Sequence, residues 1–285
     1  MERAAARAAQ AEVPVLILGE AGSGRSALAR TLHRLSPRAA GPLIEVDPST
    51  VPAALFESEL FGHRRGAFTG AERDLPGRVA RAAHGTLVLD HVEDLPLETQ
   101  PKLLRLAAER VYAPLGGVET AADVRLVAIG PEDLPARAAR GLFRSDLFFR
   151  LEVITLRLPP LRARRDEIPA LAGELLGDLA ARMGLPAPAL APGALAWMRD
   201  HAWPGNLREL RNLLERALLL HEQGPLDPEP PPAIAVSRPR PLAETEAIEI
   251  AKALAHTRGR QGEAARLLGI SRKTLWEKRK RYGIP

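Results

Sequence analysis

A glycine-rich octapeptide, GEAGSGRS at residues 19–26, constrains the fold of this chain more than any other feature. It follows the apolar run VPVLIL at residues 13–18, and residues 26–35 after it show helical periodicity. Glycines at this spacing, between a buried strand and a helix N-terminus, let backbone N–H groups surround a phosphate. A glycine turn with a purely structural role is the alternative. The sequence predicts a phosphate-binding loop formed by Gly19, Glu20, Ala21, Gly22, Ser23, Gly24, Arg25 and Ser26.

Further buried strands are indicated at residues 86–90 and 124–129, and a helix is expected at residues 97–108 between them. Strands that alternate with helices favour an α/β fold, in which helices cover both faces of a parallel sheet. Beyond the third strand the pattern becomes helical, broken only by proline and glycine. We therefore expect an α/β subdomain at residues 1–160 and a helical subdomain at residues 161–223.

Proline and charge separate the C-terminal part of the chain from the rest. Seven of the eighteen residues at 224–241 are proline, which predicts an extended linker. The remaining residues, 242–285, carry 10 Lys/Arg against 5 Asp/Glu and so hold the whole net charge of +5. Such a basic segment is either a solvated surface or a nucleic-acid-binding unit, and charge alone does not distinguish them.

The chain contains no cysteine, which excludes a disulfide framework, a cysteine-ligated zinc or iron–sulfur site and a thiol nucleophile. Its longest apolar runs fall far short of the ~20 residues that a membrane-spanning helix needs. The N-terminal residues show no signal-peptide pattern. We therefore expect a cytoplasmic protein with no membrane partner.

Two residues near the predicted loop are suited to hold Mg²⁺. Ser26 closes the loop, and Asp90 ends the predicted strand at residues 86–90. In nucleotide sites of this kind a loop hydroxyl and a strand-end carboxylate hold the metal. The next position carries His91, where a hydrolase of this class needs the acid that polarises the attacking water.

Residues 57–71 read ESELFGHRRGAFTGA and contain the hexapeptide GAFTGA in a setting that is hard to obtain by chance. With these residues the chain resembles the sigma-54-dependent transcription activators, the bacterial enhancer-binding proteins of the NtrC type. The resemblance extends from residue 13 to residue 284. Further matching stretches are LPLETQPKLLR at 95–105, GLFRSDLFFRL at 141–151, LPPLR at 158–162 and WPGNLREL at 203–210.

The resemblance implies an AAA+ fold, with a P-loop parallel sheet and a helical lid. It also implies a homo-oligomer, from a dimer to a hexamer-type ring, that uses ATP and Mg²⁺ to remodel the closed promoter complex of the sigma-54 RNA polymerase holoenzyme. Arg144 and Arg150 match the arginine-finger positions that reach a neighbour's nucleotide, and Arg208 matches the sensor arginine of the lid. The expected sigma-54 contact is formed by Gly66, Ala67, Phe68, Thr69, Gly70 and Ala71, with Phe68 and Thr69 at its tip.

Four positions near the phosphates depart from the family pattern. Arg25 replaces the loop lysine, and His91 replaces the catalytic glutamate. Asp47 and Pro131 replace two asparagines, the partner of that glutamate and the first sensor. Asp47 and His91 are expected to face each other, either as a compensating acid–base pair or as the result of drift at a site without turnover. The candidate catalytic positions are Asp90, His91, Asp47, Arg144 and Arg150.

Two functions therefore remain open at this point. The first is an ATP-driven sigma-54 activator, favoured by the intact hexapeptide and by both finger arginines. The second is a DNA-binding regulator whose AAA+ body assembles without hydrolysis, favoured by the four departures. An unrelated AAA+ remodelling protein is a third reading, which the hexapeptide disfavours.

Residues 262–278 read GEAARLLGISRKTLWEK, which predicts a helix, a glycine turn and a second helix. This pattern resembles the Fis-type helix-turn-helix that ends many members of the family, so double-stranded enhancer DNA is the expected partner. Ser271 is a natural N-cap for a recognition helix at residues 272–282. The expected DNA contacts are Ser271, Arg272, Lys273, Thr274, Trp276 and Lys278. A helix at residues 242–256 is expected to pack or dimerise through Leu242, Ile248, Ile250, Ala251 and Leu254.

Overall fold

A computed structural model describes residues 2–221, 223–231, 242–257 and 259–283. The chain divides into two compact units, Met1–Pro231 and Pro232–Pro285. Most of the predicted linker, residues 232–241, lies outside the described residues. Within the described residues no helix is both long enough and apolar enough to cross a membrane.

The first unit is built on a five-stranded parallel sheet with strand order β2-β5-β8-β1-β9. The three predicted strands are present as β1, β5 and β8, and two further strands complete the sheet at its edges. In the centre, Val15 of β1 lies opposite Val127 of β8 and Ile154 of β9. The strands are β1 Val15–Gly19, β2 Leu43–Val46, β5 Thr86–Leu89, β8 Arg125–Gly130 and β9 Ile154–Leu158.

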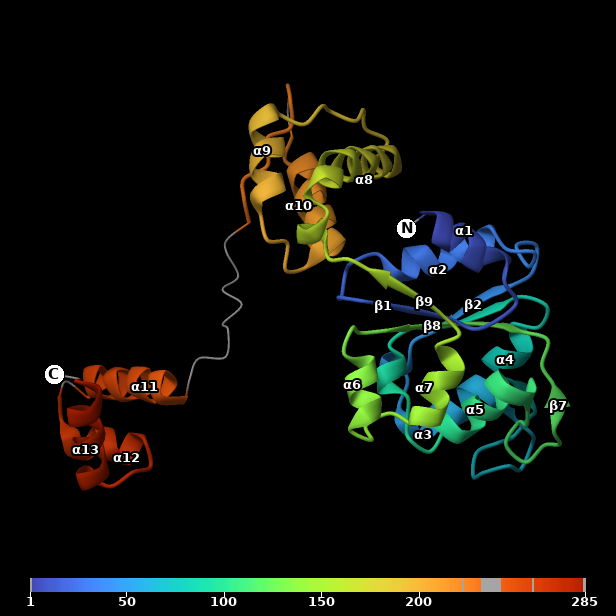
Figure 1. Ribbon diagram of the computed structural model, residues 1–285, viewed down its shortest axis with the longest axis horizontal. Helices are drawn as coiled ribbons and strands as arrows, with labels where there is room; N and C mark the ends of the chain where they lie inside the picture. Colours follow the sequence, from blue (N-terminus) through green and yellow to red (C-terminus); the bar gives the residue numbers. More distant parts are fainter. Residues whose placement is uncertain (1, 222, 232–241, 258, 284–285) are drawn as a thin grey trace. The chain divides into compact units, whose positions relative to one another are not determined.

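Helices cover both faces of this sheet, with α1 and α2 on one face and α3, α5, α6 and α7 on the other (Figure 1). Side chains alternate along a strand, so β1 contributes to two cores. Leu16 and Leu18 join the core beneath α3, α5 and α7, whereas Val15 and Ile17 join the core beneath α1 and α2. The helices are α1 Glu2–Gln10, α2 Arg25–Arg34, α3 Ala53–Phe61, α4 Arg78–Arg81, α5 Gln100–Glu109, α6 Leu134–Ala139 and α7 Ser145–Leu151.

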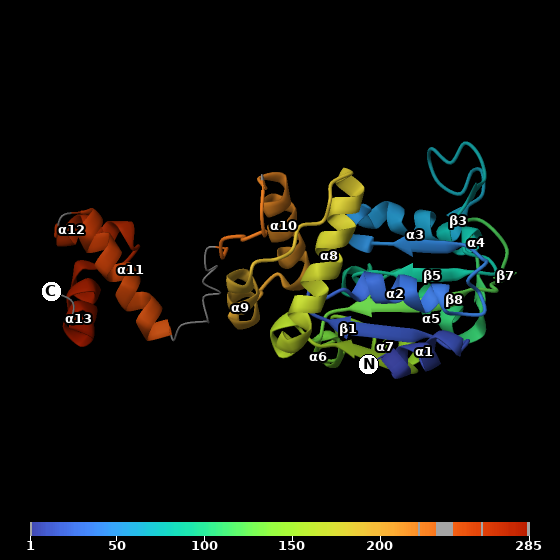
Figure 2. The same ribbon diagram turned by 90° about the horizontal axis from the view of Figure 1, so that it is seen from above.

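Short elements connect these helices and strands. A two-stranded pair carries the loop with the GAFTGA hexapeptide, which extends away from the sheet (Figure 2). A second pair lies in the connection between α5 and β8. The pairs are β3 Gly62–His63 with β4 Leu75–Pro76 and β6 Val111–Tyr112 with β7 Thr120–Ala121, and the 3₁₀ turns are η1 Pro48–Thr50 and η2 Val92–Asp94.

The helical lid follows β9 and has its own core. Trp203 is fully buried there, and its indole N–H donates a hydrogen bond of 2.8 Å to the Met198 carbonyl. Proline at the start of α8 and α9 suits helix N-termini, where the missing N–H costs nothing. The lid elements are η3 Leu161–Ala163, η4 Arg165–Glu167, α8 Ile168–Met183, α9 Pro192–Asp200 and α10 Asn206–Leu219.

The second unit consists of α11 Leu242–His256, α12 Gln261–Leu267 and α13 Arg272–Tyr282. Its core contains Ile250 and Leu254, as expected, but Ala253 rather than the exposed Ala251 completes the buried face of α11. Ala264, Ala265 and Leu275 close this core from the other two helices. The side chains of Leu242 and Ile248 lie outside the described residues.

Candidate functional site

The phosphate loop connects the end of β1 to the start of α2, as the sequence predicts. Gly22 and Gly24 have φ angles of 75° and 102°, in the left-handed region that favours glycine. A Cβ atom on Gly22 would lie 2.4 Å from the Gly205 carbonyl oxygen of the lid, so the close approach also requires glycine. The loop therefore has the backbone shape of a phosphate cradle, closed on one side by the lid.

Arg25 occupies the position at which the family carries the phosphate-binding lysine. Its side chain is buried, and Nη1 donates hydrogen bonds to the carbonyl oxygens of Gly19, at 2.9 Å, and Gly130, at 2.6 Å. These two carbonyls end the neighbouring strands β1 and β8. Because a guanidinium has several donors in a fixed plane, it bridges strand ends in a way that a lysine ammonium does not. In this structure Arg25 joins the two strands beneath the loop.

Ser26 and Asp90 lie next to each other, with the Ser26 hydroxyl donating a hydrogen bond of 2.8 Å to Asp90 Oδ2. A hydroxyl and a carboxylate in this arrangement fit Mg²⁺, which binds through one or two protein oxygens, water and substrate phosphates. No cluster of three or more His, Cys, Asp or Glu side chains suited to a metal occurs in the described residues. The donor set therefore fits a metal that is held together with a nucleotide.

Asp47 and His91 face each other, as expected. His91 Nδ1 lies 3.1 Å from Asp47 Oδ2, and His91 has a left-handed φ of 53° at the start of η2. Burial raises the pKa of Asp47, but hydrogen bonds from Ser49 and His91 outweigh burial and hold this pKa below its usual value. The ionised carboxylate therefore accepts a hydrogen bond from Nδ1–H of His91, which leaves Nε2 as the ring nitrogen that is not bound to Asp47.

Glu93 is a further acidic residue of this site, and the sequence did not single it out. Its Oε2 atom is buried without a hydrogen-bond partner among the described residues, and it lies 3.7 Å from where a Cβ of Gly130 would stand. Burial raises the pKa of Glu93, the Asp94 charge adds to this, and the charges of His91 and Arg25 oppose it. An acidic residue two positions after His91 was the only available sequence signal.

Replacing Glu93 with glutamine is expected to raise the melting temperature more at about pH 8 than at about pH 4. The folded chain binds the Glu93 proton more tightly than the unfolded chain does, so this carboxyl destabilises the fold only above the ordinary glutamate pKa. For a domain of this size each kcal/mol of cost removed raises Tm by about 2–4 °C. Calorimetry of Glu93→Gln and of the exposed control Glu98→Gln tests this. An equal gain at both pH values would contradict it.

Arg144 and Arg150, at the predicted finger positions, form hydrogen bonds within their own chain. Arg144 forms a bidentate ion pair with Asp146, at 3.0 and 2.7 Å. Arg150 donates to the carbonyl oxygens of Ala107, at 3.0 Å, and Ala108, at 2.9 Å, near the end of α5. Contact with a neighbour's nucleotide would require these bonds to be exchanged.

Pro131 follows β8 and supplies neither an amide side chain nor a backbone N–H.

Arg208 lies on the first turn of α10, with its Cβ 3.1 Å from where a Cβ of Gly22 would stand. The structure thus brings the predicted lid arginine against the phosphate loop. The loop with Ser26 follows the carboxyl end of β1, Asp47 follows that of β2, and Asp90 and His91 follow that of β5, all in the same parallel sheet. Ligands of open α/β sheets bind at this edge.

The GAFTGA loop is closed by a hydrogen bond of 2.8 Å from the Gly66 N–H to the Ala71 carbonyl. Thr69 is exposed, and Phe68 is 39% exposed and packs its ring edge-on against His63 at 4.9 Å between centroids. Asp74 joins the two sides of the stem, because it pairs with the Arg64 guanidinium at 2.5 Å and accepts from the Arg65 N–H at 2.8 Å.

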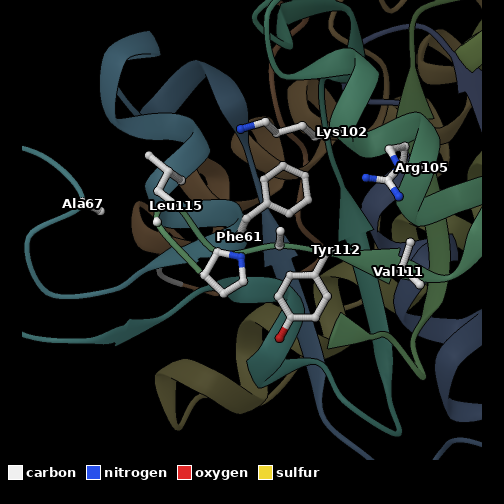
Figure 3. Close-up of a pocket in the computed structure, with 10 residues that line it drawn as sticks. Phe61, Ala67, Lys102, Arg105, Val111, Tyr112 and Leu115 are labelled. Carbon is white, nitrogen blue, oxygen red and sulfur yellow. The ribbon is translucent and has the colours of Figure 1, made fainter. Parts of the chain in front are cut away.

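A pocket of ~330 Å³ lies at the base of this loop, between the loop and α5 (Figure 3). Phe61 and Tyr112 line it, together with Leu115 from the loop between β6 and β7. The Leu115 N–H donates to the Gly62 carbonyl at 2.9 Å, and the Arg64 N–H donates to the Leu115 carbonyl at 2.9 Å. The β6–β7 loop therefore supports the stem and also approaches Ala67, whose Cβ lies 3.0 Å from where a Cβ of Gly116 would stand.

In the second unit, Ser271 caps α13 by accepting a hydrogen bond of 3.0 Å from the Thr274 N–H. Arg272 and Lys273 are exposed at this end of the helix, and Trp276 is 56% exposed with Lys280 Nζ 5.5 Å from its ring centroid.

Lys278, one of the expected DNA contacts, has a partner within the second unit. Its Nζ donates to Glu246 Oε1 at 2.5 Å, and the Tyr282 hydroxyl donates to Glu246 Oε2 at 2.6 Å. The hydrogen bonds from Lys278 and Tyr282 hold the pKa of Glu246 below its usual value. Lys278 therefore joins α13 to α11 in this structure.

The sheet, the phosphate loop and the lid define an AAA+ P-loop module, to which a helix-turn-helix unit is appended. Residues 1–157 match the family model described as "Sigma-54 interaction domain". Residues 162–245 match "AAA+ ATPase lid domain", and residues 241–282 match "Bacterial regulatory protein, Fis family". The chain belongs to the sigma-54-dependent transcription activators. The predicted family and fold class are confirmed.

Individual relatives agree with this assignment. The alginate biosynthesis transcriptional regulatory protein AlgB of Pseudomonas aeruginosa is 43% identical, over 98% of this chain and 64% of its own length. The C4-dicarboxylate transport regulator DctD of Rhizobium meliloti is 42% identical, over 97% and 60%. The crystal structure of NtrX from Brucella abortus in complex with ATP is similar to this chain, with a TM-score of 0.72 and 32% identity. The match covers 99% of this chain and 67% of the NtrX chain. The chain thus spans less than two thirds of the length of these first two relatives.

Proposed function

We propose that this chain is a transcription regulator that binds ATP and Mg²⁺ at its phosphate loop, binds enhancer DNA through α13, and contacts sigma-54 through residues 66–71. One observation carries the proposal. A phosphate loop with an adjacent Ser26–Asp90 pair and a projecting GAFTGA loop occur on one AAA+ unit. Promotion of open complexes by the sigma-54 RNA polymerase holoenzyme, in a ring of copies of this chain and in the cytoplasm, is the function that these features support.

The residues of the site fit a nucleotide with its metal. The backbone N–H groups of the loop and the N-terminus of α2 would hold the phosphates, and Ser26 and Asp90 would hold Mg²⁺. Bound Mg²⁺ would neutralise charge on the phosphates. Arg208 would approach the phosphates from the lid, and Arg144 and Arg150 would act on the nucleotide of a neighbouring subunit. Asp47 would hold Nδ1–H of His91, leaving Nε2 to accept a proton from water.

Replacing both Phe68 and Thr69 with alanine is expected to reduce open-complex formation at a sigma-54 promoter at least about 30-fold. Exposed residues at the centre of an interface contribute 2 kcal/mol or more when they are hot spots. The reaction of the full chain with sigma-54 holoenzyme is followed by footprinting of the melted promoter. Val118→Ala, which truncates an exposed apolar residue of the neighbouring β6–β7 loop, is the matched control. Full activity of the double variant would refute the proposed contact.

The hydrogen bonds of the Arg25 side chain favour a second function, regulation of transcription without ATP hydrolysis. Its guanidinium is bound to the Gly19 and Gly130 carbonyls rather than free to reach a phosphate. A chain that binds nucleotide weakly or without turnover could still assemble and occupy DNA. In that case it would regulate transcription by occupancy, and phosphate release would stay at background in every variant.

A further inference from the structure

The outer side of the phosphate loop is held by the lid. Three successive loop carbonyls accept hydrogen bonds from lid residues, two at the start of α10 and one in the segment before α8. Ala21 accepts from Asn206 Nδ2 at 3.0 Å, and Gly22 accepts from the Leu207 N–H at 2.9 Å. Ser23 accepts from Arg164 Nη2 at 3.1 Å. A loop that turns its N–H groups inward to a phosphate leaves its carbonyls outward, so these contacts are available while a phosphate is bound.

Asn206 is at the centre of this contact. It is fully buried and has a φ angle of 52°, a conformation that costs a non-glycine residue energy unless its surroundings enforce it. Its Oδ1 accepts from the Leu161 N–H at 2.7 Å, and its Nδ2 also donates to Glu20 Oε2 at 3.1 Å. A backbone N–H on one side, and a carbonyl and a carboxylate on the other, fix the orientation of the amide group.

Glu20 extends the contact to the segment that precedes α8. It forms a bidentate ion pair with Arg162, at 2.7 and 2.5 Å. The hydrogen bond from Arg162 lowers the pKa of Glu20, burial opposes this, and the Asn206 amide lowers the pKa further. Glu20 is therefore an anion that faces one guanidinium and one amide donor of the lid.

We propose that Asn206 is a positioning residue, whose side-chain amide couples the shape of the phosphate loop to the position of the lid. This inference rests on the proposed nucleotide binding and extends it to a residue that does not touch the nucleotide. Asn206 and Arg208 share the first turn of α10, so the bond that holds the loop also places Arg208 against it. Nucleotide occupancy and lid position then change together.

Asn206→Asp tests the coupling with minimal change of shape. Aspartate tolerates the left-handed backbone and keeps an acceptor for the Leu161 N–H. It replaces both amide donors with an oxygen that faces the Glu20 carboxylate and the Ala21 carbonyl. Two lost bonds, one of them to a charged group, are expected to weaken ADP binding about 10- to 100-fold by calorimetry. Asn212→Asp, an exposed asparagine on the same helix, is the matched control and should bind ADP like the parent chain.

Hydrogen exchange distinguishes coupling from a general loss of structure. In the parent chain, ADP is expected to slow exchange of the Leu207 N–H, which donates to the Gly22 carbonyl. In Asn206→Asp at saturating ADP, this protection should fall to near the nucleotide-free level. The double variant Glu20→Gln with Asn206→Asp should recover part of it, because the new amide can donate to the new carboxylate.

Asn206→Gly supplies the same test if the aspartate variant fails to fold, because glycine keeps the backbone conformation and removes the whole amide. Parent-like ADP affinity and parent-like protection of Leu207 in the folded variants would overturn the coupling alone. A parent chain that binds no ADP would instead overturn the proposed nucleotide site and, with it, this inference.

Discussion

A chain that ends at residue 241 is expected to lose specific DNA binding, with affinity for its enhancer site reduced about 10³-fold or more. The first 241 residues carry equal numbers of acidic and basic side chains, so the whole net charge lies in the part that is removed. That part contains the capped helix α13, with Arg272 and Lys273 exposed at its N-terminal end. Base contacts by this end of a recognition helix give specificity, and phosphate contacts give the salt dependence.

Fluorescence anisotropy with duplexes selected by the full chain, at several salt concentrations, measures this loss. Lys273→Ala in the full chain should weaken binding to the selected duplex by about 1–3 kcal/mol and relax its sequence preference, because Lys273 lies at the end of α13 that is expected to meet base edges. Lys278→Met is an internal comparison. Because Lys278 is paired with Glu246, Lys278→Met should mainly lower the stability of the second unit, and it should change the salt slope of DNA binding only slightly. Retained specific binding by residues 1–241 would contradict the assignment of α13.

The strands of the first unit show which part of a fold local sequence can predict. The strands β1, β5 and β8 lie in the interior of the sheet and are uniformly buried, and apart from Thr86 and Arg125 at the starts of β5 and β8 each is a short continuous apolar run. β2 and β9 are edge strands, and each carries an exposed charged residue, Glu45 or Arg157. Partial exposure removes the continuous apolar run on which the prediction depends, and both strands were missed.

The features of the site likewise divide into those that local sequence predicts and those that packing of distant elements sets. The phosphate loop and the N-cap at Ser271 depend on neighbours in the sequence, and both motifs predicted their local geometry. The Asp47–His91 contact was predicted through the family resemblance rather than from spacing. The contact of Asn206 with Glu20 joins residues 186 positions apart, and the bond from Arg25 to Gly130 spans 105 positions. Packing of distant elements sets such contacts, so residue types alone do not reveal them.

His91→Ala is expected to lower phosphate release from ATP about 10²- to 10⁴-fold, the usual contribution of a positioned general base. The reason is geometric. Asp47 accepts at 3.1 Å from Nδ1, so Nε2 of His91 is the ring atom left to take a proton from water. Asp47→Asn removes the carboxylate that orients the ring and should lower the rate by a similar factor. Phosphate release by the purified chain, with and without enhancer DNA, measures both.

The two substitutions together discriminate an acid–base pair from two independent defects. If Asp47 acts through His91, the double variant should be no slower than His91→Ala, because removal of the base leaves the orienting carboxylate nothing to act on. His84→Ala is the control, since His84 also pairs with an aspartate, Asp123 at 2.8 Å, but at an exposed position on another surface. Background phosphate release by the parent chain, unchanged by His91→Ala, would show that the pair does not catalyse hydrolysis. The AAA+ body would then act by assembly and by occupancy of DNA. The hydrogen bonds that hold the Arg25 guanidinium on the Gly19 and Gly130 carbonyls would be the structural reason for the absence of hydrolysis.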